Sequence, residues 1–200
     1  MASASTRRAV RFARPHLVGA HYSTGPRLPV AADLDGDGFA DLACVYWPDG
    51  GILDVGSSER GLKMHRHESP ASGLGGEAVS ATARAGEIAW LTRDGRVGAY
   101  ATGTGGGVKI LAEGLDASGG TILALGATYL VPHPSGSWTL VGVGPIHGAS
   151  AYSAVGAWGD TVFWTANGSL HRGSLAGATV TGEILGPAGP DRLLAGDFDG

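Results

Sequence analysis

The sequence is poor in charged residues, in cysteine and in long apolar segments. Only 16% of its 200 residues are charged and the formal net charge is −4, which argues against nucleic acid as a general partner. The lone cysteine, Cys44, excludes an internal disulfide. No apolar run approaches the roughly 20 residues that cross a membrane as a helix, and no long segment has the helical period. We therefore expect no membrane span and an absence of long helices.

Acidic residues are also missing from residues 1–27. This segment carries five arginines, which are Arg7, Arg8, Arg11, Arg14 and Arg27. A start that contains arginine and serine but no acid is similar to an organelle transit peptide. The segment has no apolar core of the kind found in secretory signals, so we expect no signal peptide in it.

Glycine, by contrast, is abundant, with 36 residues, and apolar residues make up 43% of the chain. The glycines separate short apolar runs, a pattern typical of many strands joined by many turns. Four pairs of apolar runs are each joined by a tight turn, and the turn glycines are Gly50, Gly95, Gly136 and Gly168. A further apolar stretch precedes each pair, so each unit holds about three or four strands, which suits a β-propeller blade.

These units predict an all-β fold, namely a β-propeller with about four blades and partial blades at both ends. The chain would form a single, partial propeller over residues 1–200. Its units are expected at residues 28–72, 77–115, 120–150 and 152–186. Two expected strands, residues 42–47 and 88–91, are apolar on both alternating faces. A strand buried between two neighbouring sheets needs this pattern, whereas a one-layer antiparallel sheet has a polar face.

Aspartates are concentrated in "DLDGDGFAD", residues 33–41, where four of them lie within nine residues. The span from Val30 to Gly50 is 20 residues, whereas the equivalent span in the other units is 13 to 16, so the aspartates occupy an added loop. Carboxylates at alternate positions of a tight loop suit calcium, which prefers about six to eight oxygen ligands. We expect calcium ligands from the side chains of Asp33, Asp35, Asp37 and Asp41 and from the carbonyl of Phe39.

Two alternatives compete with this prediction. An EF-hand loop needs a glutamate at position 12 and flanking helices, but position 12 is Cys44, inside a strand-like run. A solvated acidic turn held by Asx hydrogen bonds needs no metal. Its carboxylates would repel one another, because no lysine or arginine occurs between residues 28 and 59. We therefore favour calcium.

The aspartate stretch resembles the D-x-D-x-D-G-x-x-D loop of FG-GAP/VCBS repeats, which occur in integrin α-chain propellers and many bacterial extracellular proteins. The resemblance implies an extracellular or cell-surface location. It also implies that residues 10–18 form the outer strand of a preceding blade. Within residues 191–200, "AGDFDG" is similar to the start of a next blade and implies a partial second metal site at Asp197 and Asp199. The other units lack the loop and should bind no calcium.

The histidines and a glycosylation-type triplet are weaker candidates. His65 and His67 lie two residues apart, but the sequence identifies no third metal ligand for them. His133 and His171 lie beside hairpin turns, where we expect surface positions. Asn167 begins the triplet "NGS", which coincides with an expected Asn-Gly turn, so turn chemistry explains it.

We expect a non-enzymatic, calcium-stabilised recognition module that binds a glycan or a protein ligand. The alternative, which the resemblance also implies, is the propeller portion of a secreted polysaccharide lyase or other hydrolase. The sequence shows no convergent acid, base or nucleophile, which favours the module. Four of the five tryptophans lie in or beside hairpin strands and should pack between blades, whereas Trp158 could stack on a sugar ring. An arc of blades exposes strand edges, so we also expect self-association.

Overall fold

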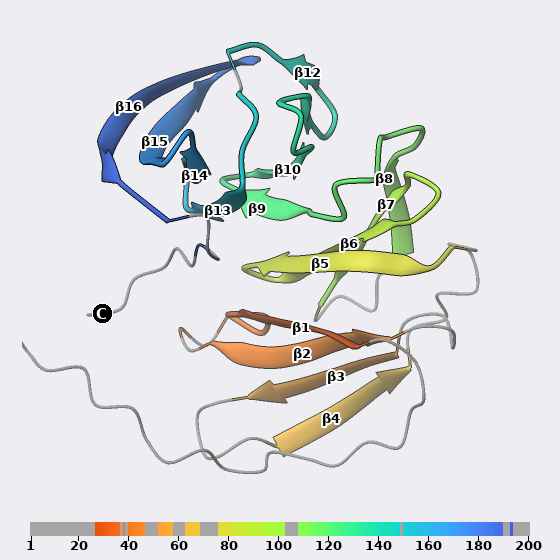
Figure 1. Ribbon diagram of the computed structural model, residues 1–200. Helices are drawn as coiled ribbons and strands as arrows, with labels where there is room; N and C mark the ends of the chain where they lie inside the picture. Colours follow the sequence, from red (N-terminus) through yellow and green to blue (C-terminus); the bar gives the residue numbers. More distant parts are fainter. Residues whose placement is uncertain are drawn as a thin grey trace, which may run out of the picture.

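The computed structural model describes residues 27–36, 38, 40–46, 52–57, 63–68, 76–102, 108–148, 150–189 and 193. These residues form 16 strands in four separate four-stranded sheets, and no helix occurs among them (Figure 1). The all-β prediction is confirmed. Within this described part of the chain there is accordingly no helix that could cross a membrane. The partial blades expected from residues 10–18 and 191–200 lie outside the described residues, apart from Leu193.

Each sheet is an antiparallel meander of four consecutive strands, and we call the sheets blades 1 to 4 in chain order. Blade 1 contains β1 (Arg27–Ala32), β2 (Asp41–Tyr46), β3 (Ile52–Ser57) and β4 (Lys63–Glu68). Blade 2 contains β5 (Ala78–Arg84), β6 (Glu87–Thr92), β7 (Val97–Ala101) and β8 (Val108–Ala112). Blade 3 contains β9 (Leu123–Leu125), β10 (Thr128–Pro132), β11 (Trp138–Leu140) and β12 (Gly144–Ile146). Blade 4 contains β13 (Ala154–Trp158), β14 (Thr161–Ala166), β15 (Ser169–Ala176) and β16 (Thr179–Pro187).

Strand β6 shows why the blades stack. Its side chains alternate between two apolar cores, because successive residues of a strand point to opposite faces. Ile88 and Trp90 join the core between blades 1 and 2, whereas Ala89 and Leu91 join the core between blades 2 and 3. All four are buried. The apolar pattern of residues 88–91 thus reflects burial on both faces of the blade.

A third core lies between blades 3 and 4 and is built around two tryptophans. Trp138 on β11 is fully buried and meets Trp164 of β14 edge-on, with ring centroids 5.5 Å apart and an interplanar angle of 87°. Leu130 and Val162 are completely buried in the same core. Edge-to-face aromatic pairs are favoured by the charge distribution of the rings, so this contact stabilises the stacking of the two blades.

The first strand of every blade is an edge strand, and these strands, β1, β5, β9 and β13, lie side by side in the middle of the molecule (Figure 1). Neighbouring first strands are joined by side-chain hydrogen bonds. The Ile122 N–H donates to Oγ of Ser80 and the Ala124 N–H donates to Oγ1 of Thr82, both at 3.1 Å. The hydroxyls of blade 2 thereby satisfy main-chain groups that the edge of blade 3 would otherwise leave open.

The hairpin of blade 4 has the turn expected from its Asn-Gly sequence. Ala166 pairs with Ser169, so Asn167 and Gly168 form a two-residue connection. Both residues have positive φ, 52° and 72°, as a type I′ turn requires.

Candidate functional site

The first two strands of each blade are connected at the same end of the molecule, but blade 1 differs from the others there. In blades 2 to 4 the pairs Arg84–Glu87, Leu125–Thr128 and Trp158–Thr161 close two-residue turns. In blade 1 Ala32 pairs with Asp41, so residues 33–40 form a longer connection. We call residues 33–41 the aspartate loop.

Three carboxylates converge in the aspartate loop. Asp33, Asp35 and Asp41 each place one carboxylate oxygen within 4.8 Å of the other two. The carboxylate of Asp33 accepts hydrogen bonds from the Gly36 N–H at 2.7 Å and from the Gly38 N–H at 3.0 Å, which curl the loop around it. These two glycines have φ of +84° and +88°, a conformation that other residues rarely adopt.

Asp41 is the buried member of this group, with only 1% of its surface exposed. Its Oδ2 accepts a hydrogen bond of 2.8 Å from the Leu34 N–H. Its Oδ1 is buried and has no hydrogen-bond partner among the described residues. A buried carboxylate oxygen without a partner is costly, and nearby carboxylates increase that cost. A cation bound between the three carboxylates would remove both penalties.

The other expected ligands are not placed. Asp37 and Phe39 lie outside the described residues, as do Asp197 and Asp199 of the partial second site. Their assignment as ligands stays a prediction.

The aspartate loop is fixed to blade 2. Leu34, 2% exposed, packs into the core between blades 1 and 2. Its carbonyl accepts a hydrogen bond from the Thr102 hydroxyl, and the Asp33 carbonyl accepts one of 3.0 Å from the Gly86 N–H. The loop therefore bridges two blades, and anything that orders it also stabilises their contact.

Blade 2 has a different polar group next to its two-residue turn. Arg84 donates to Oε1 of Glu87 from Nε at 3.1 Å and from Nη2 at 2.6 Å, and the Tyr129 hydroxyl donates to the same oxygen. The guanidinium carbon of Arg84 lies 4.7 Å from the centre of the Tyr129 ring. Sequence analysis missed this network, because Tyr129 is supplied by blade 3. The one local signal was the opposite charges of Arg84 and Glu87 across a turn.

The pKa values of this network follow from its contacts. Burial alone would raise the pKa of Glu87, but the hydrogen bonds from Tyr129 and Arg84 together outweigh it and hold the pKa below its usual value. Burial, together with the Glu87 carboxylate, raises the pKa of Tyr129 well above its usual range. Glu87 is therefore ionised and Tyr129 is neutral at neutral pH.

A cavity of about 470 Å³ opens where the first strands of all four blades converge. Residues of β1, β5, β9 and β13 and of the turns after the last two of these strands line it, and we call it the axial cavity. Among the described residues that line it, Arg84 alone is charged. Trp158 lies on its wall with 52% of its surface exposed. Sequence analysis had singled out Trp158, but it could not place the residue in a cavity.

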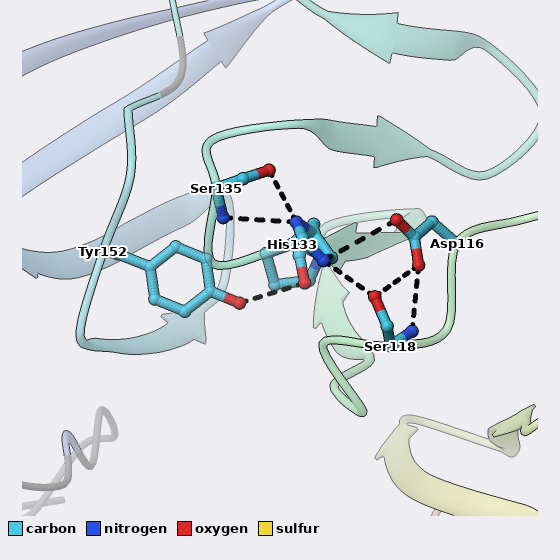
Figure 2. Close-up of polar contacts among 6 residues, drawn as sticks. Asp116, Ser118, His133, Ser135 and Tyr152 are labelled. Atoms are coloured by element: carbon cyan, nitrogen blue, oxygen red, sulfur yellow. Dashed lines mark hydrogen bonds and ion pairs between the residues drawn. The ribbon is translucent and has the colours of Figure 1, made fainter.

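His133 belongs to a polar network at the hairpin tip of blade 3 (Figure 2). Its Nε2 lies 2.8 Å from Oγ of Ser118 and 3.6 Å from Oδ2 of Asp116, and its Nδ1 lies 2.6 Å from Oγ of Ser135. The Ser118 hydroxyl also donates to Asp116 at 2.6 Å. In a Ser-His-Asp triad, serine and carboxylate lie on opposite ring nitrogens. Here Ser118 and Asp116 lie on the same ring nitrogen, Nε2. Ser135 lies on the other, but its main-chain N–H also donates to that Nδ1, at 3.2 Å, so its contact belongs to the tight turn.

The equivalent hairpin of blade 2 supports a structural role for this network. There the Thr92 hydroxyl donates to Asp94, two residues later, at 2.5 Å, as His133 contacts Ser135 in blade 3. His133 is accordingly a partly buried brace between a turn and the connection from blade 2, where the sequence predicted a surface position.

The remaining candidates take structural positions or lie outside the described part. His171 stacks on Trp164, with ring centroids 5.1 Å apart. Trp90, Trp138 and Trp164 are buried, as their expected packing role requires. Trp47 lies outside the described residues. His65 and His67 are on β4, whose backbone alone is described.

No protein-family model and no curated protein matches the sequence significantly. The structure is similar to that of PorZ, described as an essential bacterial surface component of the type-IX secretion system of Porphyromonas gingivalis, a β-propeller-like protein. The match has a TM-score of 0.51 at 16% identity and covers 84% of this chain and 22% of PorZ. This chain has a β-propeller fold.

A second structural match is weaker. YCF48 from Cyanidioschyzon merolae matches with a TM-score of 0.41 at 16% identity, over 72% of this chain and 55% of YCF48. This chain therefore spans only part of either protein.

Proposed function

We propose that this chain is a calcium-binding β-propeller recognition module of the FG-GAP/VCBS kind, which binds a glycan or protein ligand outside the cell. The observation that carries the calcium assignment is the buried Oδ1 of Asp41, which has no hydrogen-bond partner among the described residues and belongs to a group of three converging carboxylates. Such an oxygen fits a cation ligand better than it fits a solvated turn.

The calcium ligands would be the carboxylates of Asp33, Asp35 and Asp41, joined by Asp37 and the Phe39 carbonyl, whose places come from the sequence. The positive charge of the cation would offset the repulsion between these carboxylates. Because Leu34 and the Asp33 carbonyl attach the loop to blade 2, calcium binding would stabilise the contact between the blades. We assign the metal a structural role, not a catalytic one.

Recognition would use the axial end of the scaffold, where four strand connections are held at fixed positions. The resemblance to FG-GAP/VCBS repeats supports a place outside the cell, and the description of PorZ as a surface component agrees with it. The alternative of a polysaccharide lyase or hydrolase would need an acid and a base in one pocket. In the part of the chain that the structure describes, Arg84 is the one charged residue that lines the axial cavity.

The calcium assignment is tested by thermal unfolding of the chain with calcium or with a chelator. Extracellular modules bind calcium with dissociation constants of about 10⁻⁴ to 10⁻³ M. At a hundredfold excess over that constant, calcium should add about 2.7 kcal/mol of stability, or roughly 5–10 °C in Tm. Asp35→Asn should lose most of this shift.

A matched control for that substitution is Asp160→Asn, which changes an exposed aspartate in the equivalent turn of blade 4. It should keep the full calcium shift. Equal melting temperatures with calcium and chelator for the unaltered chain would show that the aspartate loop is a solvated turn. Release of sugar from a polysaccharide by the pure chain, abolished by one acidic substitution, would establish the hydrolase alternative.

A further inference from the structure

The axial cavity has the size of a ligand site. Small-molecule sites usually enclose about 300–1,000 Å³, and this cavity of about 470 Å³ lies within that range. Its walls are the first strands of four blades, each held by a sheet behind it. Groups on such strands keep fixed positions, which lowers the entropy cost of binding.

The exposed Trp158 is the feature of the cavity that most strongly indicates ligand binding. The other three tryptophans in the described part of the chain are buried in cores between blades, but Trp158 is 52% exposed. It ends β13, and Gly159 and Asp160 turn the chain directly after it. Its indole therefore lines the cavity beside a short hairpin turn. Large exposed aromatic groups on a concave surface are typical of binding sites.

The polar groups of the cavity favour a neutral partner with many hydroxyls. Arg84 is the one charged residue among the described lining residues, and two of its nitrogens are already bonded to Glu87, which balances its charge. Thr82 adds a hydroxyl to the lining. The walls are also edge strands, whose main chain carries both donors and acceptors, although the Ala124 N–H is already bonded to Thr82. These groups hydrogen-bond hydroxyls in either sense without requiring a charge.

We propose that the axial cavity binds a short neutral oligosaccharide, with one sugar ring stacked on Trp158 and its hydroxyls bonded to the first strands. A pyranose combines an apolar C–H face with equatorial hydroxyls, which matches an aromatic wall beside polar edges. The proposal rests on the proposed recognition function and names its ligand class and its site. None of Asp33, Asp35 and Asp41, the expected calcium ligands that the structure describes, lines the cavity, so the two sites can be tested separately.

The test is isothermal titration of the chain with four trisaccharides: cellotriose, mannotriose, chitotriose and the charged trigalacturonate. At least one neutral trisaccharide should bind saturably, with a dissociation constant of about 1 mM or below. Trp158→Ala should weaken that binding by about tenfold or more, because the stacked apolar surface is lost. Trp158→Phe should restore part of the affinity, since it keeps an aromatic face.

Ile184→Ala is the matched control, because Ile184 is an exposed apolar residue on β16 that lies outside the cavity lining. It should leave the affinity unchanged. Three results would overturn the proposal: no saturable binding of any neutral trisaccharide, binding of trigalacturonate alone, or equal binding by Trp158→Ala. Any of these results combined with a calcium-dependent Tm shift would leave the calcium proposal standing.

Discussion

Blades 1 and 2 differ in how they accommodate an acidic side chain next to the turn between their first two strands. In both, the chain turns from the first to the second strand at the axial end, and acidic side chains are partly or fully buried there. In blade 2 the Glu87 carboxylate lies between Arg84 and Tyr129, so its charge is balanced within the protein. In blade 1 the buried carboxylate of Asp41 has one main-chain partner and two carboxylate neighbours.

This difference shows how a repeated scaffold can acquire a site in one unit alone. The strands, the apolar cores and the direction of the turn are shared by the blades. Among the connections from the first to the second strand, that of blade 1 is the long one, whereas those of the other blades are two-residue turns. The network of blade 2 is complete within the protein. In blade 1 the buried Oδ1 of Asp41 has no hydrogen-bond partner among the described residues, and there we propose that a cation binds. Three substitutions separate these two situations.

The largest effect is expected from Leu34→Ala, which removes the apolar anchor of the aspartate loop. Leu34 is almost completely buried between blades 1 and 2, so its truncation should cost about 3 kcal/mol. The carboxylates remain in place, so the loss should be similar with calcium and with chelator. Urea unfolding in the two conditions measures this. Leu185→Ala, on the exposed part of β16, is the control and should cost less than about 0.5 kcal/mol.

The next effect is expected from Asp41→Asn, which keeps the shape of the side chain and removes its charge. In chelator the variant should be as stable as the unaltered chain or more stable, because a buried charge and its repulsion are gone. In excess calcium it should lack the gain of about 2.7 kcal/mol. Unfolding in the two conditions separates these outcomes. Destabilisation of the variant in chelator would show that the Asp41 charge is balanced without a metal.

The fold was predictable because its main signals are local. The apolar faces of residues 88–91 and the turn at Asn167 and Gly168 each lie within a few residues of sequence. They gave the all-β class and the stacking of sheets, which the structure confirms. The bonds that join neighbouring blades were not predictable. Ser80 and Thr82 each hydrogen-bond a residue 42 positions later, and no local sequence pattern predicts such a contact.

The candidate sites also differ in whether they form within one stretch of sequence or between blades, and only the first kind could be predicted. The aspartate loop is a single short stretch, so the meeting of Asp33, Asp35 and Asp41 could be expected from their spacing. The axial cavity is lined by residues of four blades, and the Tyr129 that bonds Glu87 of blade 2 belongs to blade 3. The sequence does not show which residues of neighbouring blades face one another, so it cannot predict that such groups come together. The position of Trp158 before a hairpin could be recognised in the sequence, but its place in the wall of a cavity could not.

The acid sensitivity of blade 2 follows from Glu87. Its pKa is lowered in the folded protein by Tyr129 and Arg84, which overcome the opposite effect of burial. The contribution of Glu87 to stability is therefore complete above its pKa in the unfolded chain, near 4.5. It declines as the pH falls below that value and through the lower pKa of the folded state.

The smallest effect is expected from Glu87→Gln, the same chemical change as Asp41→Asn but in the network of blade 2. It should destabilise the chain at pH 7 by about 1 kcal/mol, because Arg84 and Tyr129 lose a charged acceptor. The difference from the unaltered chain should shrink as the pH falls below 4.5, where Glu87 takes up a proton first in the unfolded chain and then, through its lowered pKa, in the folded protein. Urea unfolding at pH 7 and pH 4 measures both effects. Glu77→Gln removes the solvent-exposed partner of Arg93 and should change stability less. A stabilising Glu87→Gln, or a difference that grows in acid, would place the two carboxylates in the same class and remove the contrast between the blades.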